Sequence, residues 1–132
     1  MKGFVDDIEG LTEDNADFRR VLYTGNHLQL VLMTLQPDDE IGEEVHDDRD
    51  QFFRIEEGTG EIVIDGKSST VTSGAGIIVP AGARHNLRNI GDEPLLLYTL
   101  YGPPEHRDGV VHKTKEEADA GEEHFDGKTT EG

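Results

Sequence analysis

Between Phe18 and Gly102 the chain is a series of short apolar or alternating runs, interrupted by turn residues about every eight to twelve positions. The runs include FRRVLYTG, NHLQLVLMTL, QFFRIEEGTG, EIVIDGKSS, GAGIIVPAG and LLLYTLYG. Almost none of this region has the 3.6-residue period of an amphipathic helix. The pattern therefore predicts an all-β sandwich or barrel, and a closed or rolled antiparallel sheet of about eight strands fits the available length.

One turn is specified sharply. Asp65-Gly66 stands between EIVI and the polar run KSSTVT. Both residues tolerate the positive φ that a two-residue hairpin requires, so we expect a tight hairpin here.

Length and composition limit the organisation and the chemistry. The chain has 132 residues, which suits one domain, with a barrel core at about 18–102 and a polar tail at about 103–132. Cysteine is absent, so a disulfide, a thiolate metal site and a cysteine nucleophile are all excluded. Any bound metal must sit on nitrogen and oxygen atoms.

The formal net charge is −17, which repels nucleic-acid phosphates and anionic lipid head groups. We therefore expect no nucleic-acid or membrane partner. The longest apolar stretch, Leu28 to Leu35, is far shorter than the roughly 20 residues of a membrane span, so a cytoplasmic location is the default. A salt-adapted origin is an alternative explanation of the acidity.

The two ends of the chain differ from the core. Thr12 is expected to cap a short helical turn over 13–17, and Thr114 followed by Glu117 is a capping-box pattern that opens KEEADA. The segment from Pro103 onward is expected to wrap the barrel surface and to fray at GKTTEG.

Four candidate metal donors follow from strand parity. Glu44 and His46 are two residues apart, so on an extended segment both side chains leave the same face. Gln51 returns inward if residues 47–50 form a turn, and His85 arrives from a distant strand after Pro80 and Gly82. Two imidazoles, one carboxylate and one amide would form a mixed nitrogen and oxygen site for a divalent transition ion, for which Zn, Mn, Fe and Ni are all candidates.

The same residues resemble the motifs of the cupin superfamily. The second cupin motif reads PxGxxHxxxN, and Pro80, Gly82, His85 and Asn89 match each of its fixed positions. In the first motif Gln51 precedes Gly58 by the spacing of the cupin glutamate, and His46 and Glu44 fall where cupins carry two histidines. The resemblance implies a double-stranded β-helix, or jelly-roll barrel, similar to the small one-domain cupins labelled mannose-6-phosphate-isomerase-like.

Two positions depart from the usual three-histidine, one-glutamate set of cupins. Glu44 replaces a histidine and Gln51 replaces the glutamate, which keeps four donors and one carboxylate. Some cupin enzymes that act on carbohydrate-derived or ureide substrates resemble this arrangement. Since an amide oxygen is a neutral donor, we expect looser metal binding than in the usual set.

The resemblance favours a metal-dependent isomerase or lyase that polarises an oxygen of a small sugar or oxo-acid substrate. Glu44 is the candidate catalytic residue, either on the metal or as a base made more basic by desolvation. A dioxygenase is the second interpretation, because His46, Asp48 and His85 could form a two-histidine, one-carboxylate triad. A metal-binding or small-molecule-binding protein without catalysis is the third.

Several further side chains are placed by parity. Phe53 and Ile55 should line the cavity beside Gln51, whereas at most one of Tyr98 and Tyr101 can face it. Arg84 and Arg88 could hold an anionic substrate, although surface ion pairs are the simpler expectation. Solvated or tail roles are expected for the remaining histidines, which are His27, His106, His112 and His124. Small cupins commonly pair through sheet edges, so a homodimer is expected.

Overall fold

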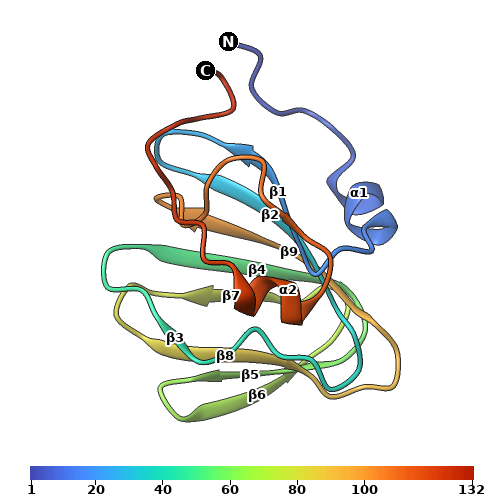
Figure 1. Ribbon diagram of the computed structural model, residues 1–132. Helices are drawn as coiled ribbons and strands as arrows, with labels where there is room; N and C mark the ends of the chain where they lie inside the picture. The colour runs from blue at the N-terminus through green and yellow to red at the C-terminus, as the bar shows by residue number, and fades with distance from the viewer.

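Two antiparallel sheets face each other in the computed structural model, which describes all 132 residues (Figure 1). The larger sheet has the strand order β10-β1-β2-β9-β4-β7, with β10 Val111–His112, β1 Arg19–Thr24, β2 Gln29–Leu35, β9 Leu95–Gly102, β4 Asp50–Glu57 and β7 Gly76–Val79. The smaller has the order β3-β8-β5-β6, with β3 Glu44–Val45, β8 Arg84–Asn89, β5 Gly60–Ile64 and β6 Lys67–Val71. The predicted all-β jelly-roll class is confirmed.

Alternation along the strands builds the core between the sheets. In β4 the side chains of Gln51, Phe53 and Ile55 are at most 3% exposed, whereas Phe52 and Arg54 are half-buried on the outer face. In β9 Tyr101 points inward and Tyr98 packs outward against Phe52. The parity predictions for these strands are confirmed.

The predicted hairpin between β5 and β6 is also confirmed. Asp65 and Gly66 have φ values of 47° and 82°. The Asp65 carboxylate additionally accepts a hydrogen bond from the backbone N–H of Arg84 at 2.9 Å. The turn therefore joins β5 to β6 and also fixes the start of β8, the strand that carries His85.

The helices are short, and one of them differs from the prediction. Helix α1, Ile8–Asp14, is capped by Asp7, so Thr12 lies inside the helix and the predicted cap was wrong. The Thr12 hydroxyl is satisfied by the Ile8 carbonyl oxygen at 2.7 Å, which explains why a threonine is tolerated there. Helix α2, Lys115–Ala120, is capped by Thr114 through the N–H of Glu117, as predicted. No helix in the structure has the length and apolar character needed to cross a membrane.

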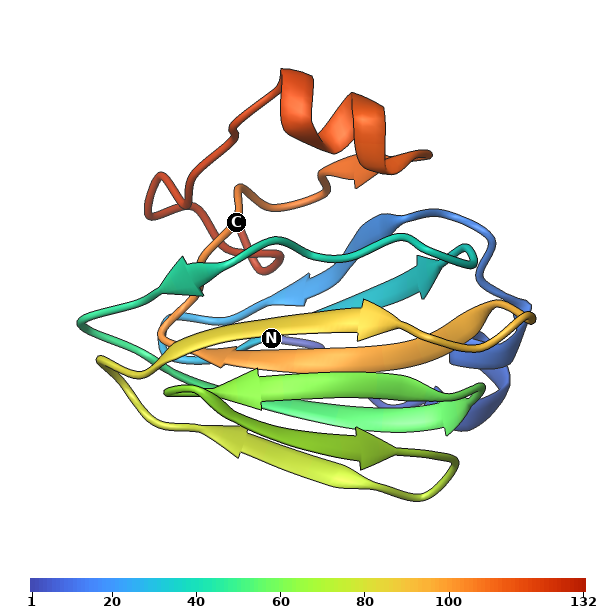
Figure 2. The ribbon, with the colours of Figure 1, turned by 90° about the horizontal axis from the view of Figure 1, so that it is seen from below.

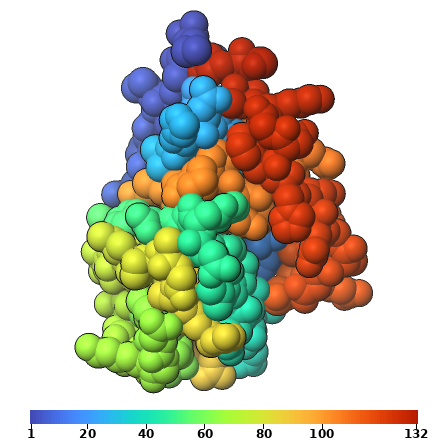
Figure 3. Space-filling view, turned by 90° about the vertical axis from the view of Figure 1, so that its left-hand side faces the viewer, coloured from blue at the N-terminus to red at the C-terminus, as the bar shows by residue number.

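The C-terminal segment does not fray. Glu131 accepts hydrogen bonds from the Tyr23 hydroxyl at 2.5 Å and from the backbone N–H groups of Lys2 and Gly3, and Thr130 bonds the backbone of Thr24. The two termini consequently lie close together at one end of the molecule (Figure 3). The polar composition of GKTTEG could not reveal these partners, because they lie more than 100 positions away in the chain.

Asn89, the last residue of the second motif, ties two loops to the barrel. Its side chain is 1% exposed, donates to the carbonyl oxygens of Leu35 and Glu93, and accepts from the N–H of Gly91. This residue closes the end of the barrel opposite the histidines.

Replacing Asn89 with alanine should lower the free energy of unfolding by about 3 kcal/mol, because buried carbonyl groups lose their donors. Asn86→Ala is the matched control, since Asn86 makes one side-chain bond, to the N–H of Gly42, and should cost about 1 kcal/mol. Chemical denaturation measures both. Equal losses in the two variants would contradict the structural role of Asn89.

The anchoring of the termini should depend on pH. The Tyr23 hydroxyl, followed by the Lys2 and Gly3 amides, lowers the pKa of Glu131 to about 2 from its ordinary value of 4.5. Since the folded pKa is depressed, the stabilisation is present above pH 4.5 and is lost as the pH falls toward about 2. In NMR spectra the chemical shifts of the Lys2 and Gly3 amides should follow this titration in the wild type. They should do so also in the control Glu116→Gln, and should not change with pH over this range in Glu131→Gln.

Candidate functional site

Three of the four predicted donors lie on two rows of side chains, one on the inner face of each sheet, and the fourth, His46, directly follows β3. In the smaller sheet Glu44 of β3 pairs with His85 of β8, which pairs with Ile64 of β5. In the larger sheet the row runs across β2, β9, β4 and β7, and its members are Gln29, Tyr101, Gln51 and Val79. Residues far apart in sequence are therefore brought together by sheet register.

His85 and Gln51 join the two rows across the barrel. His85 Nε2 lies 3.2 Å from Gln51 Oε1, and both side chains are at most 4% exposed. His85 Nδ1 lies 3.1 Å from the carbonyl oxygen of Ala83, which can only accept, so Nδ1 carries a proton. The Gln51 amide nitrogen donates to Thr99 Oγ1 at 3.0 Å.

This arrangement leaves a chemical mismatch. In the neutral imidazole with Nδ1 protonated, the lone pair of Nε2 faces the lone pairs of Gln51 Oε1. A cation on Nε2, either a proton or a metal ion, would satisfy both atoms, and so would a flip of the Gln51 amide. The pair is thus built to meet an electron-poor centre or to exchange its hydrogen-bond roles.

His46 lies between two carboxylates near the mouth of the barrel. Its Nε2 is 3.4 Å from Glu44 Oε2 and its Nδ1 is 3.4 Å from Glu105 Oε2. Nε2 is buried and makes no hydrogen bond. The ring centroids of His46 and His85 are 5.5 Å apart. His46 therefore presents an unsatisfied nitrogen toward the region that Glu44 and His85 share.

The turn before β8 holds His46 against His85. The N–H of Gly82 donates to the carbonyl oxygen of His46 at 2.8 Å, and Gly82 has a φ of +89°. A residue with a β-carbon would be strained in this conformation. The glycine of the second motif thus links the two histidines through the backbone.

The pKa of Glu44 is lowered, whereas from the sequence we expected burial to raise it. Burial favours the protonated carboxyl, but His46, followed by Arg19 and His85, outweighs burial and lowers the pKa of Glu44. The proposed gain of basicity by desolvation was therefore wrong in direction. The Glu44 carboxylate raises the pKa of His46, Glu105 adds to the increase, and burial opposes it.

The C-terminal segment contributes residues that the sequence did not indicate. Glu105 contacts His46 and also forms an ion pair with Arg49, and its side chain is 12% exposed. His106 Nε2 lies 3.3 Å from the hydroxyl of Tyr101. Burial lowers the pKa of His106 to about 2, with further lowering by Arg19 and nearby histidines, so this ring is neutral. Figure 2 shows this segment, in orange and red, lying along the barrel beside β1 and β3.

Other candidates fall outside the site. Asp48 is 72% exposed and bonded to Arg49, so it does not complete a triad with His46 and His85. Arg84 and Arg88 form surface ion pairs with Glu43 and Glu61, the simpler of the two expectations. His112 departs from the expected solvated role, because its side chain is 7% exposed and contacts Arg19 and Glu123.

The four predicted donors lie in two contacting pairs, His85 with Gln51 and His46 with Glu44, and do not form a closed cage. The only set of three imidazole or carboxylate donor atoms that all lie within 4.8 Å of one another comes from Glu9, Glu13 and Glu56. Glu44, His46 and His85 are therefore more widely spaced than that in at least one pair. Their donor types suit a divalent transition ion, and the unpaired His46 Nε2 is consistent with such a ligand.

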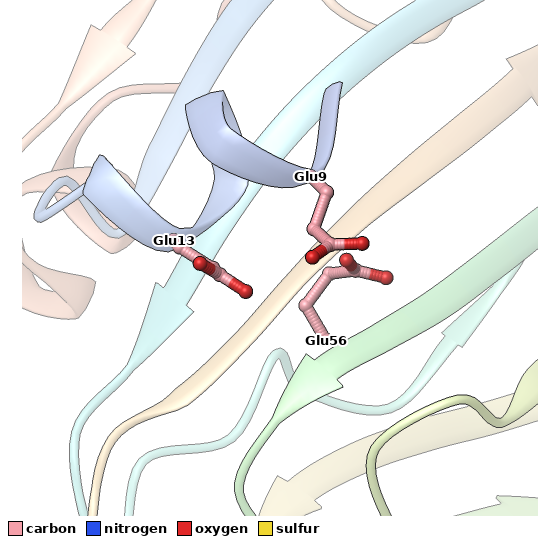
Figure 4. Close-up of side chains that lie close together, drawn as sticks. All are labelled: Glu9, Glu13 and Glu56. Carbon is pink, nitrogen blue, oxygen red and sulfur yellow. The ribbon is translucent and has the colours of Figure 1, made fainter. Parts of the chain in front are cut away.

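The three-glutamate cluster was not foreseen from the sequence. Glu9 and Glu13 project from α1 toward Glu56 of β4 (Figure 4). Arg54 Nε lies 2.8 Å from Glu56 Oε1 and offsets part of the charge. Desolvation, followed by the neighbouring carboxylates, raises the pKa of Glu13. The cluster contains no imidazole and lies on the outside of the barrel.

Comparison with known proteins gives consistent results. A family model described as a cupin domain matches residues 31–101. The chain is 46% identical over 129 residues to the uncharacterized protein YrkC of Bacillus subtilis, covering 92% of this chain and 69% of YrkC. It is 40% identical over 113 residues to the uncharacterized protein L612 of Acanthamoeba polyphaga mimivirus, covering 82% and 70%. The crystal structure of BH2720 from Bacillus halodurans has a TM-score of 0.89 and 44% identity, covering 91% of this chain and 96% of that one.

Proposed function

The chain belongs to the cupin domain family, and on that premise we propose that it binds one divalent transition ion through Glu44, His46, Gln51 and His85. We propose further that it is an isomerase or lyase acting on a small sugar or oxo acid. When bound, such an ion polarises a hydroxyl or carbonyl oxygen of the substrate.

One observation carries this proposal: the buried Nε2 of His46 makes no well-aligned hydrogen bond, and its polar contact is the Glu44 carboxylate at 3.4 Å. A buried polar atom without a partner is costly, and such atoms gather at functional sites. The approach of His85 Nε2 to Gln51 Oε1 at 3.2 Å adds to it, because two further potential donor atoms lie together between the sheets.

The chain's own groups have separate tasks in this proposal. Glu44 stays ionised at neutral pH because its pKa is lowered, so it supplies the single negative charge of the donor set. Glu105 lies on the Nδ1 side of His46 and orients its ring, as carboxylates commonly do behind metal-binding histidines. Phe53 and the buried Tyr101 restrict the access of water from within the barrel.

Metal loading tests the donor set directly. Glu44→Ala and His85→Ala should abolish loading while the barrel stays folded, because each removes a charged or nitrogen donor. Glu43→Ala is the control, since Glu43 is adjacent but exposed and paired with Arg84. Elemental analysis after dialysis against metal, together with circular dichroism, gives the result. Full occupancy in the first two variants would exclude the proposed site.

The orientation of Gln51 provides a second test. Thr99→Val keeps the shape of the side chain but removes the acceptor that holds the Gln51 amide. We expect metal affinity to fall by about 10- to 100-fold, the usual effect of losing a group that orients a ligand. Calorimetric titration with Zn²⁺ measures the change.

Thr34→Val is the matched control for this test. Thr34 is also buried and hydrogen-bonded, to Asn15, and it belongs to no part of the proposed site. Its loss should reduce stability by about 1 kcal/mol and leave affinity unchanged. Equal affinity in all three proteins would remove Gln51 from the donor set.

The alternative reactions are separable by experiment. Consumption of oxygen by the iron-loaded protein would favour the dioxygenase interpretation, although the exposed Asp48 leaves that triad without its carboxylate. Bound metal with no turnover of sugars, sugar phosphates or oxo acids would favour a binding protein without catalysis.

A further inference from the structure

Arg19 differs from every other arginine in the chain. The chain has seven arginines and a net charge of −17, and the other six each lie within 4 Å of a carboxylate. Arg19 has no carboxylate partner, and its Nε is buried without a hydrogen bond. Glu44 interacts with Arg19 through charge alone, without a contact within 4 Å. A partly buried guanidinium without a contacting carboxylate can therefore bind an anion that is not part of the chain.

Two contacts hold the Arg19 side chain in place. Its Nη1 lies 3.4 Å from His112 Nδ1, and the guanidinium carbon lies 5.5 Å from the centre of the Phe18 ring. His112 is itself fixed by Glu123, whose Oε2 is 3.0 Å from Nε2. These contacts position the guanidinium and leave its Nε free to donate.

The guanidinium borders a cavity next to the proposed metal donors. The cavity measures about 160 Å³, and its walls include Arg19, Glu44, Glu105, His106 and His112. Its volume is below the range of about 300–1,000 Å³ typical of drug-sized ligands, so it suits a small molecule.

The walls of the cavity are acidic overall, and Arg19 is the one place in them that offers a permanent positive charge to an anion. Each carboxylate in its walls lies within 4 Å of a lysine, arginine or histidine: Glu44, Glu105, Asp119, Glu122 and Glu123. Arg19 is the only arginine or lysine in the walls, and no carboxylate lies within 4 Å of it, whereas Glu44 and Glu122 each have only a histidine as partner. With Glu44 and Glu105 so close, a singly charged group is repelled less than a dianionic phosphate.

We propose that Arg19 binds the carboxylate of a small 2-oxo or 2-hydroxy acid. This inference rests on the proposed function and narrows its substrate class, since Arg19 shares its cavity with Glu44, one of the proposed metal donors. A planar guanidinium pairs with a planar carboxylate through two parallel hydrogen bonds, which gives orientation as well as affinity. Arg19 thereby determines specificity for acids over neutral sugars.

Titration of the ¹⁵N-labelled, Zn²⁺-loaded protein with pyruvate tests the inference. Pyruvate should bind the wild type, and Arg19→Gln should weaken binding by about 10- to 100-fold, because a charge-assisted hydrogen-bonded pair is lost. Arg20→Gln is the matched control, since Arg20 is the next residue on β1, is exposed and pairs with Asp17, and its variant should bind like the wild type. Hydroxyacetone, which lacks the carboxylate, should bind the wild type and Arg19→Gln equally weakly.

The Nε–H resonance of Arg19 gives a readout that does not depend on the variant folding. In the wild type it should shift on addition of pyruvate and stay in place with hydroxyacetone. Equal pyruvate affinity in Arg19→Gln, no pyruvate binding at millimolar concentration, or an Arg19-dependent preference for inorganic phosphate would each overturn the inference.

Zinc loading, measured first, separates this inference from the function on which it rests. A wild type that does not load zinc refutes the proposed metal site. A wild type that loads zinc but binds pyruvate independently of Arg19 refutes only the role of Arg19.

Discussion

Polar groups inside the barrel must be paired, and this constraint organises the structure. Gln29, for example, is fully buried in the larger sheet, and its amide bonds Thr24 and the backbone of residues 105 and 106. At the opposite end of the barrel the buried Asn89 side chain makes three hydrogen bonds to backbone groups. Three buried side-chain nitrogens lack a well-aligned hydrogen bond. Arg54 Nε is 2.8 Å from the Glu56 carboxylate on the outer face, whereas His46 contacts Glu44 and Arg19 shares a cavity with it.

The C-terminal segment is a wall of the site as well as a cover for the sheet. The backbone N–H groups of Glu105 and His106 donate to Gln29 Oε1 and hold the C-terminal segment on the larger sheet. The same hydrogen bonds place the Glu105 carboxylate beside His46. Lys115 of α2 donates to the carbonyl oxygen of Ile41 and joins the segment to the strand region before β3. The site is therefore small, and its walls come from both sheets and from the C-terminal segment.

Local patterns in the sequence were sufficient for the strands and for the inward or outward direction of several side chains. The two-residue period places Gln51, Phe53 and Tyr101 inward. Asp65-Gly66 predicts a tight hairpin turn, because both residues tolerate the positive φ that they adopt. Most features that the sequence did not predict are non-local. Burial raises the pKa of Glu44, but His46 two residues away lowers it most, and the distant Arg19 and His85 add to the lowering. The contacts of Glu105 and Glu131 likewise join segments that are far apart in the sequence. The capping position in α1 differed because Asp7 and Thr12 are both acceptable capping types, and a buried pocket for the Thr12 hydroxyl is visible only in three dimensions.

The central claim is that two sheets gather imidazole, carboxylate and amide donors around one cation. Anomalous diffraction at the zinc edge, from crystals grown with one equivalent of Zn²⁺, tests it most directly. The account predicts one strong peak bounded by His46 Nε2, His85 Nε2 and the oxygens of Glu44 and Gln51. A peak at Glu9, Glu13 and Glu56 alone, or no peak inside the barrel, would contradict it.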